Sequence, residues 1–181
     1  MSAEIEIRPF AEDDARQVRA LFILVNRLLS PPELRDAFEA YIERALIEEI
    51  DRIAAYYGEH NGEFWVAIQD DRVVGPFGLE HSGPNIMELR RMYVAPAARR
   101  HGIARRMLRF AEEECRQRKV LKLELSTAEL QKEALAFYRS AGYRLVREDL
   151  AQTGSNKTVG AGIRRFYFEK TLRAVAVERL A

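Results

Sequence analysis

The chain has 181 residues, which is enough for one domain with a substantial core and too short for two large domains. Hydrophobic residues make up 48% of the sequence and charged residues 31%, so the composition is that of a globular protein and excludes a disordered or fibrous one. The 29 Lys and Arg residues balance 28 Asp and Glu residues, so no overall field indicates a nucleic-acid or membrane partner.

The cysteine content and the start of the chain predict the compartment. Cys115 is the single cysteine, and it lies on the apolar stripe of an expected helix, which is typical of a buried structural thiol. No group of Cys and His residues has the spacing of a zinc site, so no metal is expected. The longest early apolar run, 20–25, is too short for a signal peptide or a membrane span. We therefore expect a cytoplasmic protein.

The first half of the chain carries strand and helix patterns in turn. Apolar and charged residues alternate over 5–8, which predicts a short strand that Pro9 ends. The spacing of apolar residues over 18–25 predicts a first helix. Steps of three and four between apolar residues predict one long amphipathic helix over 33–58. The residues 64–79 predict a hairpin with a polar turn.

The second half continues this alternation. After a turn-rich stretch at 81–85, the sequence predicts three strands and two helices in alternation, a long loop and a last strand. The strands are expected over 87–94, 120–125, 143–146 and 164–171, and the helices over 103–118 and 130–141. The long loop is expected over 152–162. No internal repeat or linker divides the chain, so one mixed α/β domain is predicted.

The segment Arg99-Arg100-His101-Gly102-Ile103-Ala104 lies where a predicted strand has ended and a helix begins. Free backbone N–H groups and the helix dipole favour an anion there. Gly102 allows close approach to the backbone, and the residues 89–111 hold seven arginines and no acidic residue. We predict a phosphate-binding loop, with a solvated helix face as the alternative. The segment lacks the other glycines of a dinucleotide fingerprint, and 154–158 lacks the upstream glycine of a P-loop.

These residues resemble the GNAT family of N-acetyltransferases, whose pyrophosphate loop carries Arg or Gln, two residues, Gly, one residue, and Gly or Ala. The similarity extends upstream over 88–96 and downstream over 130–143, where Tyr138 is followed by Gly142 and an aromatic residue. The resemblance implies a single α/β (α+β) domain over 1–181, with a mixed sheet of six to seven strands flanked by about four helices. The cofactor-binding core is expected over 87–146.

The resemblance also implies acetyl-CoA as the donor substrate, with its pyrophosphate on the loop and its pantetheine arm along the strand that ends at Val94. Splaying of the fourth and fifth strands would leave backbone groups near Met92 and Val94 free to pair with that arm. Gln131 stands where many relatives carry Asn, and Arg100 where Gly is frequent. The residues expected to bind the cofactor are Met92, Tyr93, Val94, Arg99, Arg100, His101, Gly102, Ile103, Ala104, Arg105, Gln131 and Phe137.

Direct transfer requires a deprotonated amine and a proton for the departing thiolate. Tyr138 is the predicted proton donor, because a phenol with a pKa of about 10 stays protonated at neutral pH; a core tyrosine is the alternative. The resemblance implies that Glu88 acts as a base through water. The alternatives for Glu88 are a salt bridge with Arg90 or another nearby arginine, or binding of the acceptor's ammonium group. His81, in the turn-rich stretch, is a competing base.

The sequence thus predicts an N-acetyltransferase that moves an acetyl group from acetyl-CoA to a primary amine of a small molecule or amino acid. A protein lysine or N-terminus is an alternative acceptor, and a non-catalytic acyl-CoA sensor or interaction module is an alternative function. The residues 125–127 and 165–168 resemble the branch that contains cysteine-conjugate N-acetyltransferases. The acceptor pocket is expected to draw on the first two helices, 81–85 and 152–162. A homodimer through the last strand or the long helix stays open.

Overall fold

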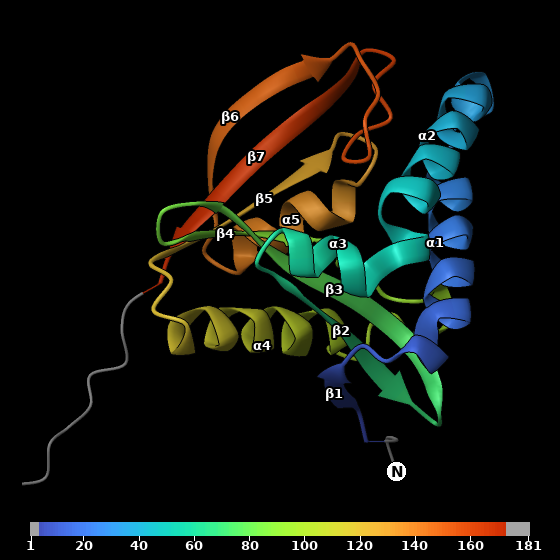
Figure 1. Ribbon diagram of the computed structural model, residues 1–181. Helices are drawn as coiled ribbons and strands as arrows, with labels where there is room; N and C mark the ends of the chain where they lie inside the picture. Colours follow the sequence, from blue (N-terminus) through green and yellow to red (C-terminus); the bar gives the residue numbers. More distant parts are fainter. Residues whose placement is uncertain (1–3, 173–181) are drawn as a thin grey trace, which may run out of the picture.

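Seven strands form one mixed sheet in the computed structural model, which describes residues 4–172 (Figure 1). The strand order is β1-β2-β3-β4-β5-β7-β6, and all neighbours are antiparallel except β4 and β5. The strands are β1 (Glu6–Pro9), β2 (Glu63–Gln69), β3 (Arg72–Gly83), β4 (Ile86–Arg90), β5 (Lys122–Ala128), β6 (Arg144–Ala151) and β7 (Ile163–Thr171). The predicted mixed α/β fold is confirmed.

The α-helices cover both faces of the sheet. They are α1 (Ala15–Leu29), α2 (Arg35–Glu48), α3 (Ile53–Glu59), α4 (Ile103–Gln117) and α5 (Lys132–Ser140). Successive residues of a strand point to opposite faces, so Trp65 packs in the core with α4 while Phe64 packs with α1 and α3. Cys115 is fully buried on α4, as predicted, and burial raises its pKa to about 12. No helix within residues 4–172 is long and apolar enough to cross a membrane.

The single long helix predicted over 33–58 is wrong. The chain leaves helical geometry at Glu49, where φ is −139° and ψ is −60°, and a 3-10 turn separates α2 from α3. The side chain of Glu49 is fully buried and accepts hydrogen bonds from Arg90, Arg91 and Tyr57. The helix therefore breaks where a carboxylate turns inward to meet two buried guanidinium groups.

Two further boundaries differ from the sequence predictions. The strand predicted over 87–94 ends at Arg90, because Arg91 has a φ of +57° and cannot continue a β ladder. The stretch predicted as a loop over 81–85 is mostly strand, since β3 runs to Gly83 and only Pro84 and Asn85 turn the chain. The long loop predicted over 152–162 is present between β6 and β7.

Candidate active site

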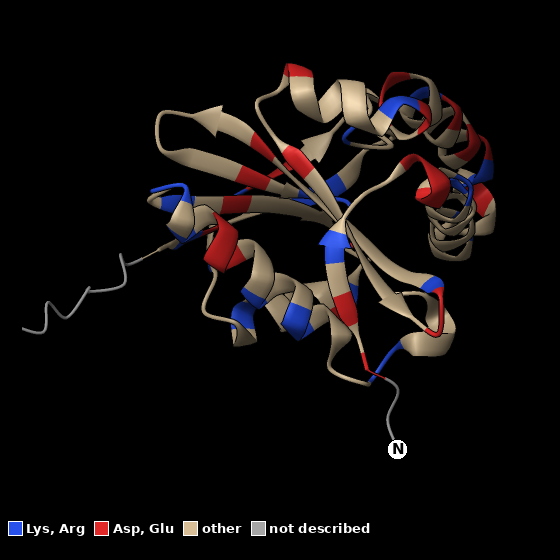
Figure 2. Ribbon diagram, turned by 60° about the horizontal axis from the view of Figure 1, so that its bottom comes forward, with Lys and Arg blue, Asp and Glu red and all other residues tan. Residues whose placement is uncertain are grey.

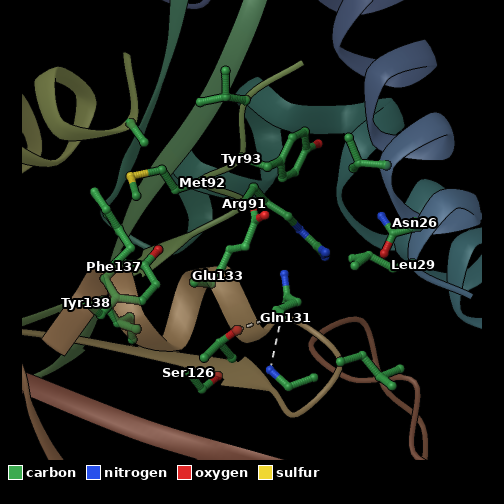
Figure 3. A pocket seen from close by; sticks show the side chains of 18 of the residues that line it. Asn26, Leu29, Arg91, Met92, Tyr93, Ser126, Gln131, Glu133, Phe137 and Tyr138 are labelled. Atoms are coloured by element: carbon green, nitrogen blue, oxygen red, sulfur yellow. Dashed lines mark hydrogen bonds between the residues drawn. The ribbon is translucent and has the colours of Figure 1, made fainter. Parts of the chain in front are cut away.

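The sheet opens between β4 and β5. These two strands pair over three positions only, ending at Glu88 and Glu124, after which β5 continues to Ala128 with β7 as its neighbour. The N–H groups of Met92 and Val94, just past the end of β4, have no backbone partner within residues 4–172. This opening forms part of a cleft with a volume of about 990 Å³ (Figure 3). The splay predicted from the sequence is therefore confirmed, and it leaves unpaired backbone donors beside the cleft.

The loop before α4 lies at one end of this cleft. Gly102 is the residue before the helix and has a φ of +73°, a conformation that side chains disfavour. No side chain caps α4, and its first turn holds no acidic residue, so the first N–H groups of the helix are available to a ligand. In Figure 2, basic residues occupy the first half of α4 and acidic residues follow, while the last turn again holds a basic residue, Arg116. This end of the cleft suits an anion.

The arginine-rich segment divides between two roles. Arg99, Arg100 and Arg105 line the cleft, as predicted for a phosphate-binding loop. Arg90 and Arg91 also border the cleft, but their side chains are only 4% and 7% exposed and pair with the buried Glu49. The cleft therefore presents less positive charge than the seven arginines of residues 89–111 suggest.

The helix α5 forms the facing wall. The ring of Phe137 lies 6.0 Å from the guanidinium carbon of Arg105, so α5 and the first turn of α4 meet at the cleft. Gln131 also lines the cleft, but its Oε1 accepts hydrogen bonds from Thr127 Oγ1 at 2.7 Å and from the N–H of Ala128 at 3.2 Å. Only its Nε2 donor is free for a ligand, because the carbonyl end of the side chain is used to fix the start of α5.

Tyr138 lies on the same wall, next to Phe137 in the close view of the cleft (Figure 3). The residue is 6% exposed, and its ring packs against Tyr143 and Phe168 at centroid distances of 5.8 Å and 6.3 Å. Burial raises the pKa of Tyr138, since the phenolate would lose its hydration. The hydroxyl is therefore protonated at neutral pH, which is the state required of a proton donor.

Glu88 lines the cleft on β4, and its carboxylate pairs with the ammonium group of Lys157 from the 152–162 loop. A salt bridge of Glu88 was among the predicted alternatives, but an arginine as its partner is wrong, and Arg90 instead pairs with Glu49 at 2.7 Å and with Glu80 at 3.1 Å. Lys157 also bonds Glu80 at 2.7 Å and so ties the loop to two strands. Glu88 is in place at the cleft, but it is held by a partner that the sequence did not predict.

Two candidate residues lie away from the cleft. His81 is an exposed residue of β3 rather than of a loop and does not line the cleft, so its place does not support a role as base. His101 is exposed as well, and its Nδ1 lies 3.3 Å from the carbonyl oxygen of Ala98. The other predicted site residues all line the cleft: Glu88, Met92, Tyr93, Val94, Arg99, Arg100, Gly102, Ile103, Ala104, Arg105, Gln131, Phe137 and Tyr138.

The other end of the cleft is built by α1, α2 and the 152–162 loop. Asn26 and Leu29 of α1 face Gln131 across the opening (Figure 3). Tyr41 of α2 and Val159 of the loop complete this end. The first two helices and the 152–162 loop, which were expected to form the acceptor pocket, therefore line the cleft. The residues 81–85, also expected there, do not line it.

Sequence reasoning missed several polar residues of the cleft. Arg91, Ser126 and Arg165 line it and were not predicted as site residues, and Lys157 was expected there only as part of the 152–162 segment. The alternation of buried and partly exposed residues in β5 could have indicated Ser126, because it lies on the face of the strand opposite to the buried Leu125 and Thr127. Within residues 4–172, no three His, Cys, Asp or Glu side chains are grouped as a metal site would require.

The chain is similar in sequence to several proteins named as N-acetyltransferases. The uncharacterized N-acetyltransferase YjgM of Escherichia coli is 32% identical over 108 residues, which is 58% of this chain and 65% of that protein. N-acetyltransferase 8 of Homo sapiens is 30% identical over 110 residues, 58% of this chain and 48% of that protein. The chain therefore spans less than two thirds of the length of these relatives.

Solved structures share the fold. The PaiA N-acetyltransferase from Thermoplasma acidophilum, in complex with coenzyme A, superposes with a TM-score of 0.70 at 21% identity, over 93% of this chain and 99% of that one. A family model described as the acetyltransferase (GNAT) family matches residues 30–143, more than half of the sequence. The chain therefore belongs to the GNAT acetyltransferase family.

Proposed function

We propose that the protein transfers an acetyl group from acetyl-CoA to the primary amine of a small molecule or amino acid. One observation carries the proposal: the uncapped N-terminus of α4 and the buried hydroxyl of Tyr138 line the same cleft, at the point where β4 and β5 separate. The first feature suits a pyrophosphate and the second a leaving thiolate. The strand opening between them suits an extended, amide-bearing arm.

The donor would bind through the backbone. The N–H groups of Ile103, Ala104 and Arg105 belong to the first turn of α4 and would bond the pyrophosphate, with Arg99 and Arg100 adding positive charge. The pantetheine amides would pair with the free backbone beyond β4, as an added strand does at a sheet edge. Phe137 and the Nε2 of Gln131 would contact the same arm from α5.

The reaction would proceed by direct attack. The amine nitrogen forms a bond to the thioester carbonyl carbon, and the bond from that carbon to sulfur breaks, which releases CoA as a thiolate. The Tyr138 hydroxyl gives its proton to the thiolate, and the attacking nitrogen gives up the proton that it loses on becoming an amide, which restores the hydroxyl. Before attack, the ammonium form of the acceptor loses a proton, and Glu88 is the carboxylate at the cleft that would take it through water. The pair between Glu88 and Lys157 must then loosen or shift during turnover.

Release of free CoA thiol from acetyl-CoA, measured with a panel of small amines, amino acids and lysine-containing peptides, tests the proposal. The expected result is acceptor-dependent thiol release, with the acetylated amine identified by mass. Binding of acetyl-CoA without release for any amine would instead support the alternative function, a non-catalytic acyl-CoA sensor. A cytoplasmic location and a homodimer stay predictions.

A further inference from the structure

Arg165 is a charged residue of the cleft that lacks a carboxylate partner. It lies on β7, is half-buried, and lines the cleft beside β5. Its guanidinium donates a hydrogen bond to Ser126 Oγ at 2.5 Å. Within residues 4–172, no carboxylate oxygen lies within 4.0 Å of its nitrogen atoms. Its chain neighbour Arg164, in contrast, is 42% exposed and pairs with Glu148 at 3.0 Å.

The carboxylates around Arg165 pair with other groups or form no ion pair with it. Glu88 lies close enough to favour the charged guanidinium, but its carboxylate pairs with Lys157. Asp149 is directly opposite Arg165 in the register of β6 and β7, but its carboxylate accepts hydrogen bonds from Arg147 at 2.7 Å and from Tyr167 at 3.3 Å. Glu124, on β5, forms no ion pair with Arg165 in the described part of the chain. The guanidinium therefore has polar neighbours in Ser126 and Tyr167 but forms no ion pair with a carboxylate in the described part of the chain.

The residues that form ion pairs around β4 balance one another in charge. Arg90, Arg91 and Lys157 pair with Glu49, Glu80 and Glu88, three cations with three carboxylates. Arg165 adds one positive charge to that set without a matching negative charge. Burial lowers the pKa of Arg165, because the guanidinium has lost hydration, and the neighbouring Tyr41, Tyr167 and Glu88 offset this loss only in part. A half-buried cation in this state is costly unless a ligand supplies the anion.

We propose that Arg165 and Ser126 bind a carboxylate carried by the acceptor amine, so that the acceptor is an amino acid or another amine with an acidic group. The inference rests on the proposed acetyl transfer and names its substrate class. The planar guanidinium presents paired N–H donors that match a carboxylate, and the Ser126 hydroxyl adds a further donor. One surplus positive charge matches one carboxylate better than a doubly charged phosphate group.

Paired acceptors test the inference directly. Each L-amino acid is compared with its α-carboxamide in the thiol-release assay, and acidic amino acids are compared with neutral ones to distinguish an α-carboxylate from a side-chain carboxylate. Loss of the recognised carboxylate is expected to lower kcat/KM by about 10- to 100-fold, the usual effect of losing a charged hydrogen bond. Equal kcat/KM for acids and their amides, or transfer to neutral amines alone, would overturn the inference.

The variant Arg165→Gln assigns the effect to this residue, and Arg164→Gln is the matched control from the exposed neighbouring position. Arg165→Gln is expected to raise KM for the carboxylate-bearing acceptor by about 10- to 100-fold, to leave KM for acetyl-CoA unchanged, and to remove the preference for acids over amides. Its Tm is expected to stay level or rise, because a costly half-buried charge is removed. A lowered Tm with the acid preference intact would mean a structural role and overturn the inference.

Binding of acetyl-CoA by the wild-type protein, followed by calorimetry, separates the two proposals. Failure to bind acetyl-CoA would contradict the proposed function itself, and with it the acceptor assignment. Binding together with transfer that ignores the carboxylate would contradict only the role of Arg165.

Discussion

The carboxylate of Glu49 accepts a hydrogen bond from Nη2 of Arg91 at 2.6 Å, and both residues stand where regular structure ends. Glu49 terminates α2, while Arg91 follows β4 in a left-handed conformation. Arg91 also donates to Tyr41 of α2, and its guanidinium carbon lies 5.1 Å from the ring centroid of Phe22 on α1. The break after α2 and the early end of β4 therefore meet in one buried contact between Glu49 and Arg91. This contact joins α1 and α2 to β4, which borders the cleft.

The variant Glu49→Gln is expected to lower the free energy of unfolding by about 3 kcal/mol, because it leaves the buried guanidinium groups of Arg90 and Arg91 without full charge compensation. Urea unfolding measures the change. Glu39→Gln is the control, since Glu39 forms an exposed pair with Arg27 and its loss should leave stability unchanged. Equal effects of the two substitutions would contradict the account of Glu49.

Stability should fall in acid more steeply in the wild type than in Glu49→Gln. Burial alone would favour the protonated form of Glu49, but the neighbouring Arg91 and Arg90 outweigh it and lower its pKa. A carboxyl group whose folded pKa is depressed stabilises the fold above the unfolded pKa of about 4.3, and this contribution is lost as pH falls through the folded pKa. Unfolding measured from pH 7 downward checks this, and identical slopes for both proteins would contradict it.

The variant Gly102→Ala is expected to weaken acetyl-CoA binding. A Cβ at this position meets no atom within 4 Å, but the φ of +73° makes any side chain strained, by about 1 kcal/mol. Relief of that strain would move the N–H groups at the start of α4. Gly162→Ala is the matched control, with a φ of +75° and equally open space, but it lies outside the loop that precedes α4.

Both substitutions should lower Tm to a similar degree, whereas calorimetry should show a higher Kd for acetyl-CoA in Gly102→Ala alone. An unchanged Kd in that variant would mean that the loop does not bind the cofactor.

The variant Tyr138→Phe is expected to lower kcat by about 10- to 100-fold with little change in the Kd for acetyl-CoA, since it removes the proton donor for the thiolate and keeps the packing. Tyr143→Phe is the control, because the Tyr143 hydroxyl bonds Glu112 at 3.1 Å and does not line the cleft. Steady-state kinetics of both variants, with Tm as a check on folding, distinguish the roles. A wild-type kcat in Tyr138→Phe would exclude it as the thiolate acid.

Local pattern in the sequence predicted much of the fold. The helix that starts after Gly102 and the splay that follows Glu88 depend on short-range signals, an αL glycine and a family motif, and both are present. The break at Glu49 was not predicted, because its cause, Arg91, lies 42 residues away in the chain. Periodicity reports a helical face but gives no sign of a distant charge that will interrupt it.

The candidate site divides in the same way. The loop residues and Tyr138 were predicted, because motifs place them along the chain. Arg165 was not predicted as a site residue, since it reaches the cleft only through the pairing of β7 with β5, 39 residues from its partner Ser126. Lys157 lies in the 152–162 segment expected at the acceptor pocket, but its ion pairs were not predicted, because its two carboxylate partners come from β3 and β4.

Thermal unfolding with acetyl-CoA, CoA and ATP in parallel tests the central claim most directly, that the cleft between β4 and β5 is a CoA site. A ligand that binds only the native state raises stability with the logarithm of its concentration over Kd. The account predicts a clear rise in Tm with both acetyl-CoA and CoA and little change with ATP. No shift with either CoA species, or an equal shift with ATP, would contradict it.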